Sequence, residues 1–289
     1  MLISIFDAKR TWRYTIVTMA IAVAVGIGGV RSVAQQGGGQ KAGRLNKVIE
    51  AVEAGRAAVG GQDWRFIDME HGPFSMDLLE STLAQMGKDR DASGRLKLTP
   101  LVRIPLEGDE DFKWAVKQVL DAGAFGIVLP HVDTAEEAAK LVRTMRYPPT
   151  RDSKYQMPRG ERGWGPGRAV RLWGLDTPTY HSKADVWPLN PNGELFAVAM
   201  IESGEAVKNI RAILKTPVSA ILVVPGDMNI DLGLGPRGDK NSPEVDEAYQ
   251  TVLRACQAQK RVVCGCADSR SNMKTRLDEG WKFFLPLGG

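Results

Sequence analysis

The residues of this sequence best suited to chemistry stand directly after short apolar runs. Asp68 and His71 belong to WRFIDMEH, Arg103 follows TPLV, Glu202 follows FAVAMI, and Asp227 follows LVVPG. Two carboxylates such as Glu202 and Asp227 can hold a hard divalent cation, with water and substrate oxygens filling its remaining positions. Such a cation would act as a Lewis acid on a carbonyl group.

The remaining polar groups suit the same chemistry. Arg103 offers a planar, permanently charged fork to an oxyanion or a carboxylate. His71 can move a proton, with Asp68 three residues before it to orient the ring. Gly226 has no side chain and lets a backbone N–H approach an anion closely. Together these groups suit the formation of an enolate next to a carboxylate.

Each residue also has a purely structural explanation. His71 would be a hydrogen-bonded structural residue, and Arg103 would form an ion pair at the edge of the core. Glu202 would be an acid at a helix N-terminus, and Asp227 would be a turn residue in PGDMN. Their shared position after successive apolar runs favours one common site.

Apolar runs alternate with amphipathic stretches from residue 60 onward, which is typical of a parallel α/β sheet. Strands are predicted at 64–68, 98–105, 126–130, 195–202, 220–225, 261–265 and 282–288. Helices are predicted at 75–86, 109–123, 134–145, 204–215, 242–259 and 271–280. A long stretch rich in Pro, Gly and Trp, 146–194, is predicted to be irregular.

Seven strands with helices between them predict a (β/α)₈ barrel of the TIM type, with AAVGG at 57–61 as the candidate eighth strand. Only three residues separate AAVG from WRFID, so the first β-α unit is expected to be reduced, without its helix. The last predicted strand is followed by no closing helix. In such a barrel the carboxyl ends of the strands face the active site, which is where the polar residues above stand.

Composition excludes some functions. The chain has 289 residues with a net charge of +4 and both signs interspersed, and no basic stripe indicates a nucleic-acid partner. The three cysteines, Cys256, Cys264 and Cys266, are too few and too oddly spaced to predict a disulfide framework, so we expect small buried core residues.

The N-terminus has the layout of a secretory signal peptide. Three basic residues precede an apolar run of 16 residues, and small residues stand before Gln35. We expect residues 1–34 to be a signal peptide or an uncleaved N-terminal anchor, unless the start codon lies further on. Residues 35–44 would be a linker and 45–289 the barrel domain. The protein would then be periplasmic or secreted, or alternatively membrane-anchored through this segment alone.

An ordered set of motifs resembles the HpcH/HpaI aldolase family, metal-dependent class II pyruvate aldolases of the phosphoenolpyruvate/pyruvate barrel superfamily. The motifs are FIDMEHGP, LVRIP, LDAGAFGIVLPHVDTAEEA, MRYPP, RGWGPGRA, MIESGEAVKNI and VPGDMNIDLG. The resemblance extends from about Trp64 to Leu287. No single motif carries it; the order of the set does.

The resemblance implies a role for each residue of the predicted site. Glu202 and Asp227 match the metal-binding acids. His71 with Asp68 matches a proton-transfer dyad, and Arg103 matches the arginine that holds the keto oxygen of the substrate.

Other matched positions concern the substrate carboxylate and the assembly. Gly226 and the backbone of Asp227 match the site for the pyruvate carboxylate. Asp121 matches a catalytic acid that reaches the neighbouring subunit's site, and Arg162 with Gly163 matches the family's RG. A homo-oligomer is therefore implied.

The implied activity is aldol cleavage or condensation of a 4-hydroxy-2-oxo acid, which gives pyruvate (or a close 2-oxo acid) and an aldehyde through an enolate, with a divalent metal as cofactor. Two alternatives remain open. One is a CoA-ester lyase of the same superfamily, and the other is an exported protein that binds a 2-oxo acid and a metal without turnover.

Overall fold

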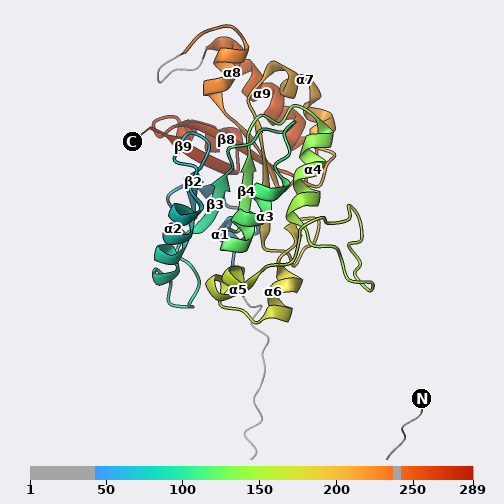
Figure 1. Cartoon of the computed structure of the whole chain (residues 1–289). Coiled ribbons are helices and arrows are strands. Elements are labelled where there is room, and N and C mark those ends of the chain that lie inside the picture. The colour runs from blue at the N-terminus through green and yellow to red at the C-terminus, as the bar shows by residue number, and fades with distance from the viewer. Residues whose placement is uncertain (1–42, 237–241, 289) are drawn as a thin grey trace, which may run out of the picture. The chain divides into compact units, whose positions relative to one another are not determined.

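Eight short parallel strands form the wall of a barrel in the computed structural model of the chain, which describes residues 43–236 and 242–288 (Figure 1). The strands are β1 (Ala58–Val59), β2 (Trp64–Asp68), β3 (Thr99–Arg103), β4 (Gly126–Leu129), β6 (Leu195–Ile201), β7 (Ala220–Val223), β8 (Val263–Ser269) and β9 (Phe283–Leu287). A further short strand, β5 (Val186–Trp187), pairs with β6 from outside this path.

The order of the strands is that of a barrel. Hydrogen-bonded neighbours run β1-β9-β8-β7-β6-β4-β3-β2, and all pairs are parallel. A single parallel bridge between Gly60 and Trp64 joins the two ends of this path. The predicted (β/α)₈ fold is therefore confirmed.

One helix precedes the first strand, and others lie between the strands and return the chain from the carboxyl end of one strand to the start of the next. They are α1 (Lys47–Glu53), α2 (Met76–Lys88), α3 (Lys113–Ala122), α4 (Ala135–Met145), α5 (Gly167–Trp173), α6 (Thr177–Lys183), α7 (Gly204–Ile213), α8 (Pro225–Asp231), α9 (Pro243–Gln257) and α10 (Met273–Glu279). Thr134 and Glu137 form a reciprocal capping box that fixes the start of α4.

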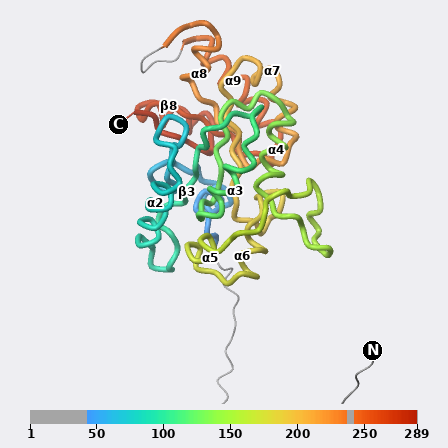
Figure 2. The backbone as a smooth tube through the Cα atoms, viewed as in Figure 1, coloured from blue at the N-terminus to red at the C-terminus, as the bar shows by residue number. Residues whose placement is uncertain are grey.

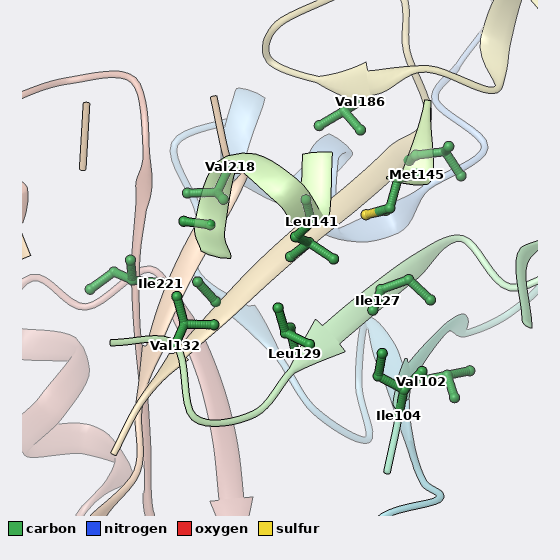
Figure 3. Packing of buried hydrophobic residues seen from close by; sticks show 14 of the residues in the cluster. Val102, Ile104, Ile127, Leu129, Val132, Leu141, Met145, Val186, Val218 and Ile221 are labelled. Atoms are coloured by element: carbon green, nitrogen blue, oxygen red, sulfur yellow. The ribbon is translucent and has the colours of Figure 1, made fainter. Parts of the chain in front are cut away.

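Side chains of the strands alternate between two apolar layers, because successive residues of a strand point to opposite faces. On β3, Leu101 belongs to the cluster inside the barrel and Val102 to the cluster under the helices. Figure 3 shows this outer layer, where Ile127 and Leu129 of β4 lie close to Leu141 of α4. The helices are thus held by their apolar faces, which leaves the strand ends free to carry polar residues.

The first β-α unit is reduced, as the sequence predicted. A turn at 61–63 connects β1 directly to β2, without a helix between them. In the described range 242–288, no helix follows β9. The stretch 146–194, predicted to be irregular, contains α5, α6 and β5, and its first part reaches away from the barrel between α4 and α5 (Figure 2).

The prediction that the cysteines form no disulfide was wrong. Cys256 of α9 and Cys264 of β8 form one, with their Cα atoms 5.8 Å apart. The packing of α9 against β8 brings the two sulfurs together, which residue spacing does not indicate. Cys266 is free and buried, as expected for a core residue.

The predicted signal peptide or anchor, 1–34, and residues 35–42 of the predicted linker lie outside the described residues. Across 43–236 and 242–288, none of the helices combines the length and the apolar character needed to cross a membrane.

Candidate active site

Asp68 and Arg103 end two neighbouring strands, and the register of β2 with β3 places them side by side. Nε and Nη2 of Arg103 donate to the two carboxylate oxygens of Asp68 at 2.9 and 2.6 Å. Nη1 of Arg103 forms an ion pair with Oε2 of Glu70 at 2.6 Å. Only 8% of the Arg103 side chain is exposed, so two carboxylates hold a nearly buried guanidinium at the mouth of the barrel.

The three charges shift one another's pKa values in different directions. Burial, the largest single influence, favours the neutral form of Asp68, but the hydrogen bonds and charge of Arg103 together with the backbone N–H groups of Glu70 and His71 outweigh it and lower the pKa of this carboxyl. For Glu70, burial prevails over the attraction of Arg103 and raises the pKa. Burial opposes the charge of Arg103, yet the hydrogen bond to Asp68 and the charge of Glu70 raise its pKa. Arg103 is therefore a permanent cation at this point.

His71 lies at the same strand end but in a more open position. Its side chain is 65% exposed. Its backbone N–H faces Oδ1 of Asp68 at 3.4 Å, while its ring Nε2 lies 3.7 Å from Oε2 of Glu70. The ring is thus placed beside Glu70, whereas Asp68 was expected to orient it.

Glu202 follows β6 and is 99% buried. Its Oε2 accepts a hydrogen bond from the backbone N–H of His131 at 2.9 Å, and its Oε1 is buried with no hydrogen-bond partner. Burial, with the charges of Asp227 and Glu70 nearby, raises the pKa of Glu202 to about 7. A buried carboxylate oxygen without a partner is unfavourable unless a cation or proton occupies the space beside it.

Asp227 stands in the first turn of α8, after β7. It lines, together with Glu202 and His131, a cavity of about 470 Å³. A Cβ added to the preceding residue, Gly226, would meet no atom within 4 Å. The space in front of this backbone is therefore open to a ligand, as the role predicted for Gly226 requires.

The residues present fit a divalent cation that takes most of its ligands from elsewhere. Glu202 contributes a buried, unpartnered oxygen, and Asp227 contributes a half-exposed carboxylate in the same cavity. No group of three or more His, Cys, Asp or Glu side chains in the described ranges could hold a metal ion. Two protein carboxylates with water and substrate oxygens suit Mg²⁺ or Mn²⁺.

Asp121 lies elsewhere. It stands in the last turn of α3, which runs back from the barrel mouth. Its carboxylate pairs at 2.6 Å with Arg162, whose guanidinium lies over the ring of Tyr147. In Figure 1, α5, which contacts α3, and α8 lie at opposite ends of the barrel. Asp121 is thus not brought to the site of its own chain.

Sequence reasoning missed two residues of this site, Glu70 as a partner of Arg103 and His131 as a partner of Glu202. His131 comes two residues after the end of β4, so the strand-end rule that selected the other residues also applied to it. A second cavity, of about 560 Å³ between the 146–159 segment and α6, contains none of the strand-end residues.

Carboxylates, a guanidinium and an imidazole lie at the carboxyl ends of the strands of a parallel barrel. This is the end at which (β/α)₈ enzymes have their active sites. The profile of one family, the HpcH/HpaI aldolase/citrate lyase family, matches residues 49–284. The chain belongs to this family. The resemblance found in its motifs is thereby confirmed, and the protein stands among the carbon–carbon lyases.

Two similar proteins carry names that describe their reactions. The chain is 34% identical over 229 residues to a hydroxypyruvate/pyruvate aldolase of Chromohalobacter salexigens, covering 78% of each chain. It is 32% identical over 205 residues to a 2-keto-3-deoxy-L-rhamnonate aldolase of Klebsiella pneumoniae, covering 70% of this chain and 65% of that enzyme. The match thus spans just under two thirds of the Klebsiella enzyme.

Solved structures agree with the fold. An HpcH/HpaI aldolase from Desulfitobacterium hafniense superposes with a TM-score of 0.67 at 26% identity, covering 83% of this chain and 89% of the other. An HpcH/HpaI aldolase/citrate lyase family protein from Burkholderia cenocepacia gives a TM-score of 0.62 at 26% identity, covering 85% and 84%.

Proposed function

We propose that this protein catalyses the metal-dependent, reversible cleavage of a 4-hydroxy-2-oxo acid to pyruvate, or a close 2-oxo acid, and an aldehyde. The observation that carries the proposal is the pair Glu202 and Asp227 in one cavity at the barrel mouth, with one oxygen of Glu202 buried and unpartnered. Relatives named hydroxypyruvate/pyruvate aldolase and 2-keto-3-deoxy-L-rhamnonate aldolase support the substrate class.

Glu202 and Asp227 would hold the cation, Mg²⁺, Mn²⁺ or Co²⁺. When bound, this ion supplies Lewis-acid polarisation of the substrate's keto group. The open backbone at Gly226 would receive the substrate carboxylate, because an added Cβ there meets nothing within 4 Å. These residues place the 2-oxo acid end of the substrate at the mouth.

Arg103 would stabilise the keto oxygen as it gains negative charge. A guanidinium has five N–H donors, and hydrogen bonds to Asp68 engage two of them in Arg103, while Glu70 forms an ion pair with Nη1. Donors therefore remain for the substrate. Because Asp68 and Glu70 fix the guanidinium before substrate arrives, little reorganisation is needed during the reaction.

His71 would accept the proton of the substrate's 4-hydroxyl group. Loss of this proton makes the 4-carbon a carbonyl and breaks the C3–C4 bond, whose electron pair passes to the 2-keto oxygen as an enolate. Protonation at C3 then gives the 2-oxo acid product. The exposed position of the ring beside Glu70 suits exchange of protons with substrate and solvent.

The acidic character of the cavity disfavours a CoA ester. Its described lining includes eight carboxylates, and neither Lys nor Arg; the acids are Glu107, Asp109, Asp133, Glu137, Glu202, Glu205, Asp227 and Asp231. The phosphates of CoA would be repelled by such a lining. The aldolase reaction, with a small substrate, fits it better.

We further propose that the protein is exported and works as a homo-oligomer. The signal-like layout of 1–34, with the barrel domain 45–289 behind it, supports export. So does the Cys256–Cys264 disulfide, because disulfides persist mainly in oxidising compartments. The position of Asp121, away from its own mouth, supports an assembly in which it serves a neighbouring copy.

Two assays test the proposed reaction and distinguish it from its alternatives. Cleavage of a 4-hydroxy-2-oxo acid should depend on Mg²⁺, Mn²⁺ or Co²⁺ and should release pyruvate. Metal and pyruvate binding without any turnover would instead indicate a binding protein, and turnover confined to CoA esters would indicate the lyase.

Export is tested by the N-terminus of the native protein, which should begin at Gln35; an intact Met1 on a cytosolic protein would contradict it.

A further inference from the structure

His131 has an unusual backbone conformation. Its φ angle is +46°, and among the described residues it is the one non-glycine residue with a positive φ. This left-handed region costs an L-residue roughly 1–2 kcal/mol, because Cβ approaches the following carbonyl. Such conformations persist where the surrounding structure enforces them, and they cluster at functional sites.

Contacts on both sides enforce the turn at His131. Its carbonyl accepts a hydrogen bond from the N–H of Gly108 at 3.3 Å, and the next residue, Val132, donates to the carbonyl of Met200 at 3.2 Å. A Cβ added to Gly108 would lie only 2.7 Å from the His131 oxygen. The close approach of these two backbones therefore requires glycine at 108.

The turn directs the His131 N–H at the carboxylate of Glu202. That N–H donates to Oε2 at 2.9 Å, while Oε1 stays buried and unpartnered. One oxygen is thus held in place and the other is left open. The imidazole makes a different contact, with Nε2 3.9 Å from Oε1 of Glu107 at the cavity wall.

We propose that His131 is a positioning residue for Glu202, and that it acts through its left-handed backbone rather than through its imidazole. The strained turn presents an N–H that fixes Oε2 and so aims Oε1 at the cation site. This inference rests on the proposed function in one respect, that Glu202 is a ligand of the metal.

Substitutions at His131 separate the backbone from the ring. His131→Gly and His131→Asn remove the imidazole but favour a positive φ. His131→Val removes the imidazole and strongly disfavours it, because Val is β-branched. We expect the Kd of Mn²⁺ for the Gly and Asn proteins to lie within about threefold of that for the unaltered protein. For the Val protein we expect a Kd about tenfold or more higher, because the left-handed backbone geometry would be lost.

Gly108→Ala tests the same turn from its other side and does not touch His131's own side chain. The added Cβ would lie 2.7 Å from the His131 carbonyl oxygen and 2.8 Å from Oε2 of Glu137. The Glu137 side chain can move aside more easily than the backbone, so the turn at His131 should shift and Mn²⁺ affinity should fall here too. Gly167→Ala is the matched control, because its Cβ would meet nothing nearer than Arg171 at 3.9 Å, on α5. This control should bind Mn²⁺ as the unaltered protein does.

The measurement is the Kd of Mn²⁺ for each full-length protein, read from the electron paramagnetic resonance signal of free Mn²⁺, with thermal unfolding to establish that each is folded. Weak binding by His131→Gly, or full binding by both His131→Val and Gly108→Ala, would overturn the inference. If His131→Val does not fold, the His131→Gly and Gly108→Ala results decide. If the unaltered protein does not bind Mn²⁺, the proposed metal site is overturned as well. If it binds Mn²⁺ but the variants do not follow the expected pattern, only the role of His131 is overturned.

Discussion

Arg103 donates two hydrogen bonds to Asp68, at 2.9 and 2.6 Å, from the end of the neighbouring strand. The pair holds the guanidinium in one plane, with Glu70 on its other side. A fixed plane is what a cation needs if it is to meet a developing oxyanion without moving. The register of β2 with β3 therefore fixes the guanidinium that we expect to stabilise the enolate oxygen.

Arg103→Lys should lower kcat by at least about 10²-fold, the cost of losing a fixed donor to an oxyanion. An ammonium group keeps the charge but cannot form the planar contact with Asp68 while it also presents fixed donors to the substrate. Steady-state cleavage kinetics provide the measurement, with Arg168→Lys, an exposed arginine on α5, as control. Kinetics equal to those of the unaltered protein would mean that Arg103 supplies charge alone.

His71→Ala should lower turnover roughly 10²- to 10⁴-fold, the usual contribution of general acid–base catalysis. Because its side chain is 65% exposed, the melting temperature and the Kd of Mn²⁺ should hardly change. His181→Ala, which removes another imidazole far from the strand ends, is the matched control. An active His71→Ala enzyme would show that the histidine has a structural role only.

The raised pKa of Glu202 predicts a pH-dependent stability of the metal-free protein. The pKa is about 7 in the folded chain against an ordinary value of 4.5. Between these two values the unfolded chain releases the proton while the folded chain keeps it, so stability is lost as pH rises. The contribution is fully present below about pH 4.5 and absent above about pH 7.

Urea unfolding of the unaltered protein and of Glu202→Gln across this window isolates the effect, because glutamine does not titrate. The difference in unfolding free energy should change by up to about 3 kcal/mol. Added Mn²⁺ should restore stability above pH 7 in the unaltered protein and not in Glu202→Gln. A constant difference at all pH values would mean that Glu202 is not desolvated as described.

The Cys256–Cys264 disulfide predicts a dependence of stability on redox state. It closes a short loop of sequence separation 8, and such a loop contributes about 2.5 kcal/mol in the chain-entropy model. A reductant should therefore lower the melting temperature of the unaltered protein but not that of Cys256→Ser/Cys264→Ser. Titration of unfolded, unreduced protein should find one thiol, that of Cys266; three thiols would contradict the disulfide.

The sequence predicted the barrel well because most strands are largely apolar runs and several carry polar residues at their carboxyl ends. Asp68, Arg103, Glu202 and Asp227 were found by this rule, and the structure places them at the mouth. The absence of a helix between β1 and β2 was also predicted, since only three residues separate the two strands.

What the sequence could not predict depends on contacts between distant segments. The hydrogen bond that holds Oε2 of Glu202 comes from His131, 71 residues earlier, and depends on a left-handed turn that contacts with distant segments fix. The disulfide depends on how α9 packs on β8. The ring of His71 lies beside Glu70 rather than Asp68, because Arg103 occupies the Asp68 carboxylate.

In the proposed reaction, Glu202 and Asp227 hold a cation that allows this chain to form an enolate from pyruvate. Exchange of the pyruvate methyl protons for deuterium in D₂O, followed by NMR, tests this directly and needs no knowledge of the aldehyde. Exchange should be rapid with Mn²⁺, Co²⁺ or Mg²⁺, should stop on chelation, and should be lost in Glu202→Gln and Asp227→Asn. Exchange that persists after exhaustive chelation, or that never occurs with any of these ions, would contradict a metal-dependent enolisation at Glu202 and Asp227.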